Sequence, residues 1–171
     1  IPRSFWYNWF LAKILIETCN SKSSESWCLI VGLHFFTDIK LNNKIITAHC
    51  ANTGSMLGLL NKNNKVWITK FNNKKRKLKY TLQIVQDIKS KVGVNTHLTN
   101  KIVNHALQNN LIKYFSKKVV IKKEQTFGLN SRFDFYLEDK NIKSFLEVKN
   151  VTLKRKNKTA EFPDAITARG T

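Results

Sequence analysis

Two acidic residues and a lysine near the C-terminal end of the chain have the types and spacing of a metal-dependent hydrolytic site. Asp134 lies between two phenylalanines, and Glu147 and Lys149 lie on either side of Val148. Successive side chains of a β-strand point to opposite faces of the sheet. The alternation therefore predicts an apolar face and an opposite face that carries Asp134, Glu147 and Lys149.

The turn between these two segments determines which residues face each other. A hairpin that turns about residues 140–141 places Asp139 opposite Ile142. The same register places Asp134 opposite Glu147, with Cβ atoms about 4.5–5.5 Å apart. Two carboxylates at that distance repel each other unless a cation neutralises them, and Mg²⁺ prefers a few carboxylates plus water. We therefore predict a site for Mg²⁺, or for Mn²⁺ as a substitute, at Asp134 and Glu147.

The chemistry expected at such a site is hydrolysis of a phosphodiester. The metal would polarise the phosphate and activate a bound water, and Lys149 would orient that water or stabilise the pentacovalent phosphate. The alternative is an ordinary surface salt-bridge ladder, in which Lys149 and its neighbours satisfy the two carboxylates. A turn of different length would shift the register by one residue and send Asp134 to the other face.

The charge of the whole chain points to a polyanionic partner. The sequence has 30 Lys and Arg residues against 11 Asp and Glu residues, a net charge of +19. Nucleic acid is the commonest partner of so positive a protein. An AT-rich coding sequence would also raise Lys, Asn and Ile, but it would raise Glu as well, and Glu is rare. We expect binding to nucleic acid, without a membrane or an obligate protein partner.

The basic residues concentrate in two runs. The first, within residues 61–80, contains no acidic residue and interleaves lysines with Trp67, Phe71 and Tyr80. We expect Trp67 and Phe71 to be core residues and the lysines to contact phosphates; the alternative is that the lysines only solvate a turn. The second run follows Lys149 and would flank a strand held beside the metal. The expected DNA-binding residues are Lys74, Lys75, Arg76, Lys77, Lys79, Lys154, Arg155 and Lys156.

Short strands with tight polar turns precede a helix and three longer strands. Expected strands at 34–41, 45–50, 66–71 and 80–85, with no helix among them, predict a small β-barrel. Asn95 or Thr96 can cap a helix that ends at Asn109. Further strands are expected at 119–127, 132–138 and 144–153. The chain is thus expected to be α+β, with 42% hydrophobic residues supplying a core.

The expected organisation is an atypical N-terminal segment (1–33), a barrel domain (34–90) and a nuclease-like domain (91–171). The N-terminal segment is apolar but too short to span a bilayer, and Asn8 and Lys13 interrupt it. Cys19, Cys28 and Cys50 match no zinc-binding spacing and are expected to be reduced thiols, so we expect a cytoplasmic protein.

Six blocks of residues, in the same order along the chain, resemble the sugar fermentation stimulation protein A family. The blocks are residues 49–56, 75–81, 92–98, 131–135, 147–153 and 162–165. The resemblance implies an N-terminal OB-like barrel and a C-terminal domain similar to PD-(D/E)xK nucleases. It also implies DNA binding without sequence preference and a regulatory link to maltose metabolism.

The resemblance also implies site residues. The family's metal-site positions correspond to Asp134, Glu147 and Lys149, and Glu124 matches a further acidic position of the family. Residues 1–33 differ from the family's opening strand, and the chain stops at Thr171, where the family continues into a helix. We therefore expect a nuclease-like domain that is truncated at its C-terminus.

Three classes of function remain open at this point. The first is a DNA-binding, regulatory protein, and the second is a magnesium-dependent nuclease that cleaves through Asp134, Glu147 and Lys149. The third is a basic, RNA-associated structural protein. Dependence of cleavage on a divalent cation separates the first two classes, and preference for structured RNA identifies the third.

Overall fold

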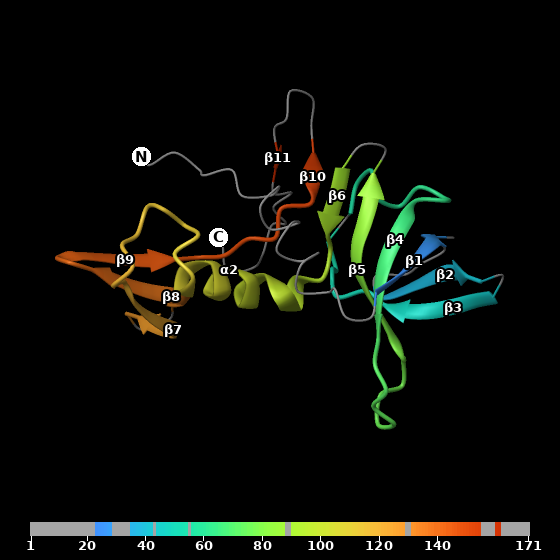
Figure 1. Cartoon of the computed structure of the whole chain (residues 1–171), viewed down its shortest axis with the longest axis horizontal. Helices are drawn as coiled ribbons and strands as arrows, with labels where there is room; N and C mark the ends of the chain where they lie inside the picture. The colour runs from blue at the N-terminus through green and yellow to red at the C-terminus, as the bar shows by residue number, and fades with distance from the viewer. Residues whose placement is uncertain are drawn as a thin grey trace. The chain divides into compact units, whose positions relative to one another are not determined.

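Runs rich in Ile, Val and Thr, separated by Asn-containing turns, form most of the strands of this protein (Figure 1). The computed structural model describes residues 23–28, 35–42, 44–54, 56–87, 90–128, 131–154 and 160–161, with the backbone alone at 23–28, 154 and 160–161. It divides into two compact units. Unit 1 comprises Ile1–Thr96 with Asn150–Thr171, and unit 2 comprises His97–Lys149. The boundary between residues 90 and 91 stays a prediction from the sequence.

Unit 1 contains a six-stranded sheet that closes on itself. Its strands are β1 (Ser23–Cys28), β2 (Phe36–Leu41), β3 (Lys44–His49), β4 (Lys65–Lys70), β5 (Tyr80–Asp87) and β6 (Ser90–Gly93). They lie in the order β3-β2-β1-β4-β5-β6, and β3 also pairs in parallel with β5. The extra pairing closes the first five strands into a barrel, which confirms the OB-like fold. A short pair, β10 (Leu153–Lys154) with β11 (Ala160–Glu161), also belongs to this unit.

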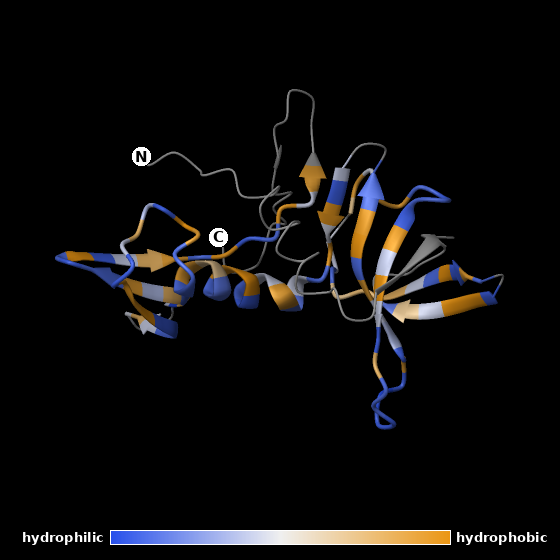
Figure 2. Ribbon diagram, in the orientation of Figure 1, coloured by the Kyte–Doolittle hydropathy of each residue, from blue (hydrophilic) through white to orange (hydrophobic). Residues whose placement is uncertain are grey.

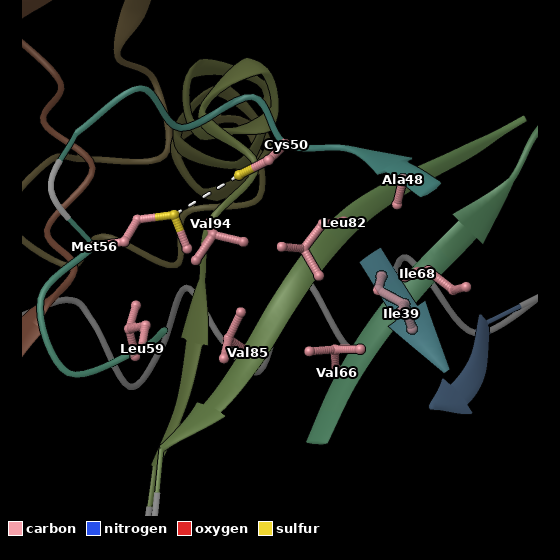
Figure 3. Close-up of a cluster of buried hydrophobic side chains, with 10 residues drawn as sticks. All are labelled: Ile39, Ala48, Cys50, Met56, Leu59, Val66, Ile68, Leu82, Val85 and Val94. Carbon is pink, nitrogen blue, oxygen red and sulfur yellow. Dashed lines mark hydrogen bonds between the residues drawn. The ribbon is translucent and has the colours of Figure 1, made fainter. Parts of the chain in front are cut away.

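The interior of the barrel is apolar (Figure 3). β5 contributes buried side chains from Thr81 to Val85, since it pairs with strands on both sides. Cys50 lies at the edge of this core as a free, buried thiol, 3.7 Å from the Met56 sulfur, and burial raises its pKa. The buried cluster comprises Ile39, Ala48, Cys50, Met56, Leu59, Val66, Ile68, Leu82, Val85 and Val94.

Unit 2 is a helix packed against a three-stranded antiparallel sheet. A 3₁₀ turn (Thr96–Leu98) leads into α2 (Thr99–Gln108), and the strands are β7 (Val120–Phe127), β8 (Ser131–Asp139) and β9 (Ile142–Leu146), in that order. Val103 and Leu107, one helical turn apart, lie in one apolar cluster with Phe135 and Leu137 of β8. Among the described residues, no helix has the length and apolar character that crossing a membrane requires.

The hairpin turn predicted at residues 140–141 forms, and the β2–β3 hairpin has a turn with the same backbone conformation. Asn42 and Lys140 have φ angles of 47° and 56°, the left-handed backbone conformation that a tight hairpin needs. Asp139 pairs with Ile142, as predicted, so the β8–β9 register is confirmed.

Two other predictions about local structure were wrong. Neither Asn95 nor Thr96 caps the helix, because their side chains form other hydrogen bonds: Asn95 Nδ2 donates to Gln83 Oε1 and Thr96 Oγ1 to Ala51 O. The strand expected at 144–153 ends at Leu146. The backbone N–H of Val148 donates a hydrogen bond to the Asp134 carboxylate instead of continuing the pairing with β8.

Replacement of Leu82 with Ala should lower the free energy of unfolding by about 2–5 kcal/mol, because Leu82 is fully buried and its loss leaves a cavity. Ile45→Ala is the matched control: its side chain is 67% exposed, so the change should stay within about 0.5 kcal/mol. Urea unfolding followed by circular dichroism measures both. Equal effects would contradict the assignment of this core.

Candidate functional site

Asp134 connects the helix, the central strand and the segment after β9. Its Oδ1 accepts a hydrogen bond from Asn100 Nδ2 of α2, and its Oδ2 accepts one from the backbone N–H of Val148, each 2.7 Å long. The side chain is half-buried. Asn100 lies one turn before Val103 on the stripe of α2 that faces the apolar cluster, which explains how it reaches the strand. Both oxygens of this carboxylate therefore have protein donors.

Glu147 follows directly after the last residue of β9. The β8–β9 ladder runs from Asp139↔Ile142 to Phe135↔Leu146, so it ends one residue short of Asp134 and Glu147. Lys149 Nζ lies 3.0 Å from Glu147 Oε1, and both side chains are about half exposed. An exposed pair of this kind contributes at most about 1 kcal/mol, so Glu147 can exchange its partner at little cost.

Glu124 occupies the corresponding position on the other side of Asp134. The β7–β8 register skips Glu124, which falls opposite Asp134 between two regular pairs. Its φ of 52° places it in the left-handed region, unusual inside a strand, and its carboxylate forms an ion pair with Arg132. Counting along the register places Glu124, Asp134 and Glu147 on one line across β7, β8 and the residue after β9, which we call the carboxylate row, although none of the three is in a ladder pair with another.

The carboxylate row supplies oxygen donors of the type that hard divalent cations prefer. Each carboxylate is held by protein donors: Asn100 and Val148 bind Asp134, and a cationic side chain pairs with each of the other two. Within the part of the chain that the structure describes, no three His, Cys, Asp or Glu side chains are grouped closely enough to hold a metal ion. A cation would therefore have to compete with Lys149 for Glu147.

The predicted apolar back of this site needs correction. Strand alternation predicts Phe133 and Phe135 on one face, but only Phe135 lies in the buried cluster with Leu107. Phe133 instead contacts Phe145, with ring centroids 5.0 Å apart. The left-handed residue Glu124 lies in the same row and interrupts the regular pleat there.

The lysine-rich run of unit 1 forms the tip of the β4–β5 hairpin, residues 71–79, hereafter the basic tip. It projects beyond the sheet, and its end is hydrophilic (Figure 1 and Figure 2). Asn73 shapes the turn, since its side-chain oxygen accepts the Lys75 N–H at 2.9 Å. The exposed lysines of the tip are Lys74, Lys75, Lys77 and Lys79.

Arg76 differs from these lysines, because its guanidinium is engaged within the protein. It lies 4.1 Å from the centre of the Phe71 ring and donates to Thr81 Oγ1 at 3.0 Å. It fastens the tip to β5 rather than pointing freely outward. Trp67 is buried, as predicted for a core residue, with the ammonium groups of Lys65 and Lys91 over its ring.

The second basic run lies largely beyond what the structure describes. Only the backbone of Lys154 is described, in β10, and Arg155 and Lys156 lie outside the described residues. Their predicted contact with DNA stays a prediction.

Sequence reasoning missed the partners that hold the site. Asn100 gave no signal, because its side chain is exposed and an exposed polar residue of a helix needs no protein partner. Asp139 gave none: its carboxylate accepts hydrogen bonds from the backbone N–H of Ser116 at 2.7 Å and from its hydroxyl at 2.5 Å. These bonds fasten the loop after α2 to the β8–β9 hairpin, and they lower the pKa of Asp139 below its ordinary value of 3.8.

Comparison with known proteins gives a consistent assignment over both units. Residues 34–94 match the family model described as the SfsA N-terminal OB domain, and residues 97–171 match the sugar fermentation stimulation protein RE domain. A "sugar fermentation stimulation protein homolog" of Pelagibacter ubique is 55% identical over 136 residues, 80% of this chain and 59% of that protein. One of Bartonella quintana is 45% identical over 139 residues, with the same coverage. The chain thus spans about three-fifths of these relatives.

A solved structure shares the fold. The structure titled "The structure of Pyrococcus Furiosus SfsA in complex with Ca2+" superimposes with a TM-score of 0.71 at 22% sequence identity, covering 88% of this chain and 63% of that one. At this identity, the likeness supports the architecture of the chain and leaves its chemistry to be argued from its own residues.

Asp139→Asn should destabilise the protein at neutral pH, and the deficit should shrink in acid. The folded-state pKa is depressed, so the ionised carboxylate stabilises the fold above the unfolded pKa, and this contribution is lost as pH falls through the folded pKa. Urea unfolding of both proteins from pH 7 down to below 3.8 measures the difference. Ser116→Ala should reproduce the same pH dependence. A deficit independent of pH would contradict the role given to this carboxylate.

Proposed function

The chain belongs to the sugar fermentation stimulation protein family, and we propose that it binds DNA without sequence preference through the basic tip of the β4–β5 hairpin. The observation that carries the proposal is the tip itself, where Lys74, Lys75, Lys77 and Lys79 are exposed on a projecting turn without an acidic residue. The ammonium groups of lysines sit on flexible side chains, so they can attract phosphates of the DNA backbone regardless of base sequence.

The shape of the tip supports contact with the DNA backbone rather than with base edges. Contacts to phosphate position a protein on DNA but carry no sequence information. Arg76, the side chain suited to bidentate recognition of guanine, is engaged with Phe71 and Thr81. Lysines alone on a turn therefore favour binding that is sensitive to salt and tolerant of sequence.

The proposal extends to a regulatory role in sugar metabolism, including that of maltose, exerted in the cytoplasm. The relatives carry the name "sugar fermentation stimulation protein homolog", which describes an effect on sugar use rather than a reaction. A non-specific DNA-binding surface is compatible with such an effect.

Replacement of Lys74, Lys75 and Lys77 together with Gln should weaken duplex binding and flatten its salt dependence. Each lost phosphate contact lowers the log–log slope of affinity against salt by about 0.9. Fluorescence anisotropy with a labelled duplex over a salt series measures both quantities. The matched control removes the same charge elsewhere, at the exposed Lys40, Lys44 and Lys101. Equal losses in the two triple variants would contradict the tip as the binding surface.

A second candidate function is cleavage of phosphodiester bonds with the help of a divalent cation. The observation that favours it is the carboxylate row, in which counting along the register places Glu124, Asp134 and Glu147 on one line. Asp134 and Glu147 would hold Mg²⁺, or Mn²⁺ in its place, and the cation would supply Lewis-acid polarisation of the phosphate. The Pyrococcus furiosus relative was solved with Ca²⁺, according to its title.

The chain's own residues would prepare that chemistry. Asn100 and the Val148 amide hold the Asp134 carboxylate in place, so it would not have to be ordered when the ligand binds. Lys149 balances Glu147 in the absence of a cation and, once displaced, presents its ammonium group to the phosphate. Glu124, paired with Arg132, completes the row as a further acidic position.

Incubation of supercoiled plasmid with the wild-type chain and Mg²⁺ or Mn²⁺ should give nicked product on an agarose gel, and chelation with EDTA should abolish it. Glu147→Gln should reduce the rate by at least about 100-fold while preserving DNA binding, because a ligand of the cation is lost. The control is Glu138→Gln, a carboxyl change on β8 outside the row. Cleavage that persists in EDTA, or equally in Glu147→Gln, would rule out this second function.

A further inference from the structure

An exposed group of four aromatic rings lies on the sheet of unit 2, beside the carboxylate row. Phe145 is at its centre, with ring centroids 4.8 Å from Phe127, 5.0 Å from Phe133 and 5.3 Å from Tyr136. We call these four residues the aromatic cluster. None of them belongs to the buried cluster around Phe135.

Two rings of the aromatic cluster remain open to solvent. Phe127 is 57% exposed and Phe145 is 40% exposed. Exposed phenylalanines lose the hydrophobic stabilisation that buried ones gain, so three mutually contacting phenylalanines at a surface indicate a site for a ligand with apolar, flat faces.

Two lysines flank the aromatic cluster, one on each outer strand, and one of them, Lys143, pairs in register with Glu138. Lys122 lies opposite Tyr136 on the neighbouring strand, with its ammonium group 5.6 Å from the centre of that ring. Lys143 lies on β9, on the other side of β8. It is two residues before Phe145 and one before Ser144, which pairs with Leu137. A ligand that lies on these rings therefore meets ammonium groups at the rim, which favours one that combines flat rings with negative charge.

Unpaired nucleotides combine those two properties. Every base has a π-face that stacks on aromatic side chains, and every nucleotide carries a phosphate. In a duplex the base faces are covered by their neighbours and cannot reach the rings. A purely apolar protein partner would use the rings but gain nothing from the lysines.

The aromatic cluster lies next to the carboxylate row in the register. The row formed by Lys122, Tyr136 and Phe145 is two residues along the strands from the carboxylate row, a separation of about 6.8 Å.

From these observations we propose that the aromatic cluster stacks unpaired bases, so that the substrate class of unit 2 is single-stranded DNA or unpaired ends. This deepens the proposed function and rests on it, since the basic tip supplies general affinity for DNA. Duplex DNA engages the basic tip alone, whereas a single strand also engages the aromatic cluster.

The test compares single-stranded and duplex DNA of one sequence, with 2-aminopurine in place of one adenine to report stacking. Phe127→Leu keeps an apolar side chain but removes the aromatic face, and should weaken binding of the single strand about 5-fold or more, with unchanged duplex affinity. It should also reduce the fluorescence change of 2-aminopurine on binding. Phe127→Tyr should restore both. Tyr114→Leu, an aromatic residue of the same unit that is 68% exposed, is the matched control.

Other outcomes would overturn the proposal. If Phe127→Leu binds single strands as the wild type does, the rings do not stack bases. If Phe127→Ser loses binding of the single strand while Phe127→Leu keeps it, binding depends on the apolar character of this side chain and not on its aromatic face. After either result, the proposal that the basic tip binds DNA still holds if the lysine variants lose duplex binding. Failure of the wild type to bind either form overturns both proposals. Circular dichroism of each variant verifies folding.

Discussion

A net charge of +19 on 171 residues constrains where the ionisable side chains of this protein can lie and which ligands it attracts. Lysines need solvent or a counter-ion, so they collect at exposed positions such as the basic tip, while the barrel core is built from apolar side chains. The few carboxylates are placed where they hold structure together: Asp134 binds the α2 side chain Asn100 and the Val148 amide, and Asp139 binds Ser116. Eleven acidic residues cannot balance thirty basic ones, so the remaining charge favours a polyanionic ligand.

The hydrogen bonds of Asp134 link the fold of unit 2 to its candidate chemistry. One carboxylate ends the β9 pairing, fixes the segment that carries Glu147 and Lys149, and holds the start of α2 beside β8. The same residue is thus a structural connector and the central member of the carboxylate row. Its two oxygens are already positioned by protein donors, so the Asp134 carboxylate is held in place by the protein itself.

The sequence predicted the features that local chemistry determines. The turn after Asp139 determined the β8–β9 register, because a tight turn restricts the backbone of few residues. It did not predict that Phe133 and Phe135 would separate, since that depends on the left-handed Glu124 of the neighbouring strand. Nor did it show that Arg76 is engaged with Phe71, a contact that only the folded hairpin creates. Contacts between elements depend on packing, which no local pattern encodes.

The proposed functions share one premise, that DNA meets the basic tip of unit 1. Chemical-shift mapping of the isotopically labelled chain with a short duplex tests this directly. The amides of Lys74, Lys75 and Lys77 should shift most, and the changes should fade as salt is added. The exposed strand residue Ile45 should be unaffected. Shifts concentrated on β2 and β3, with the tip unchanged, would contradict the account.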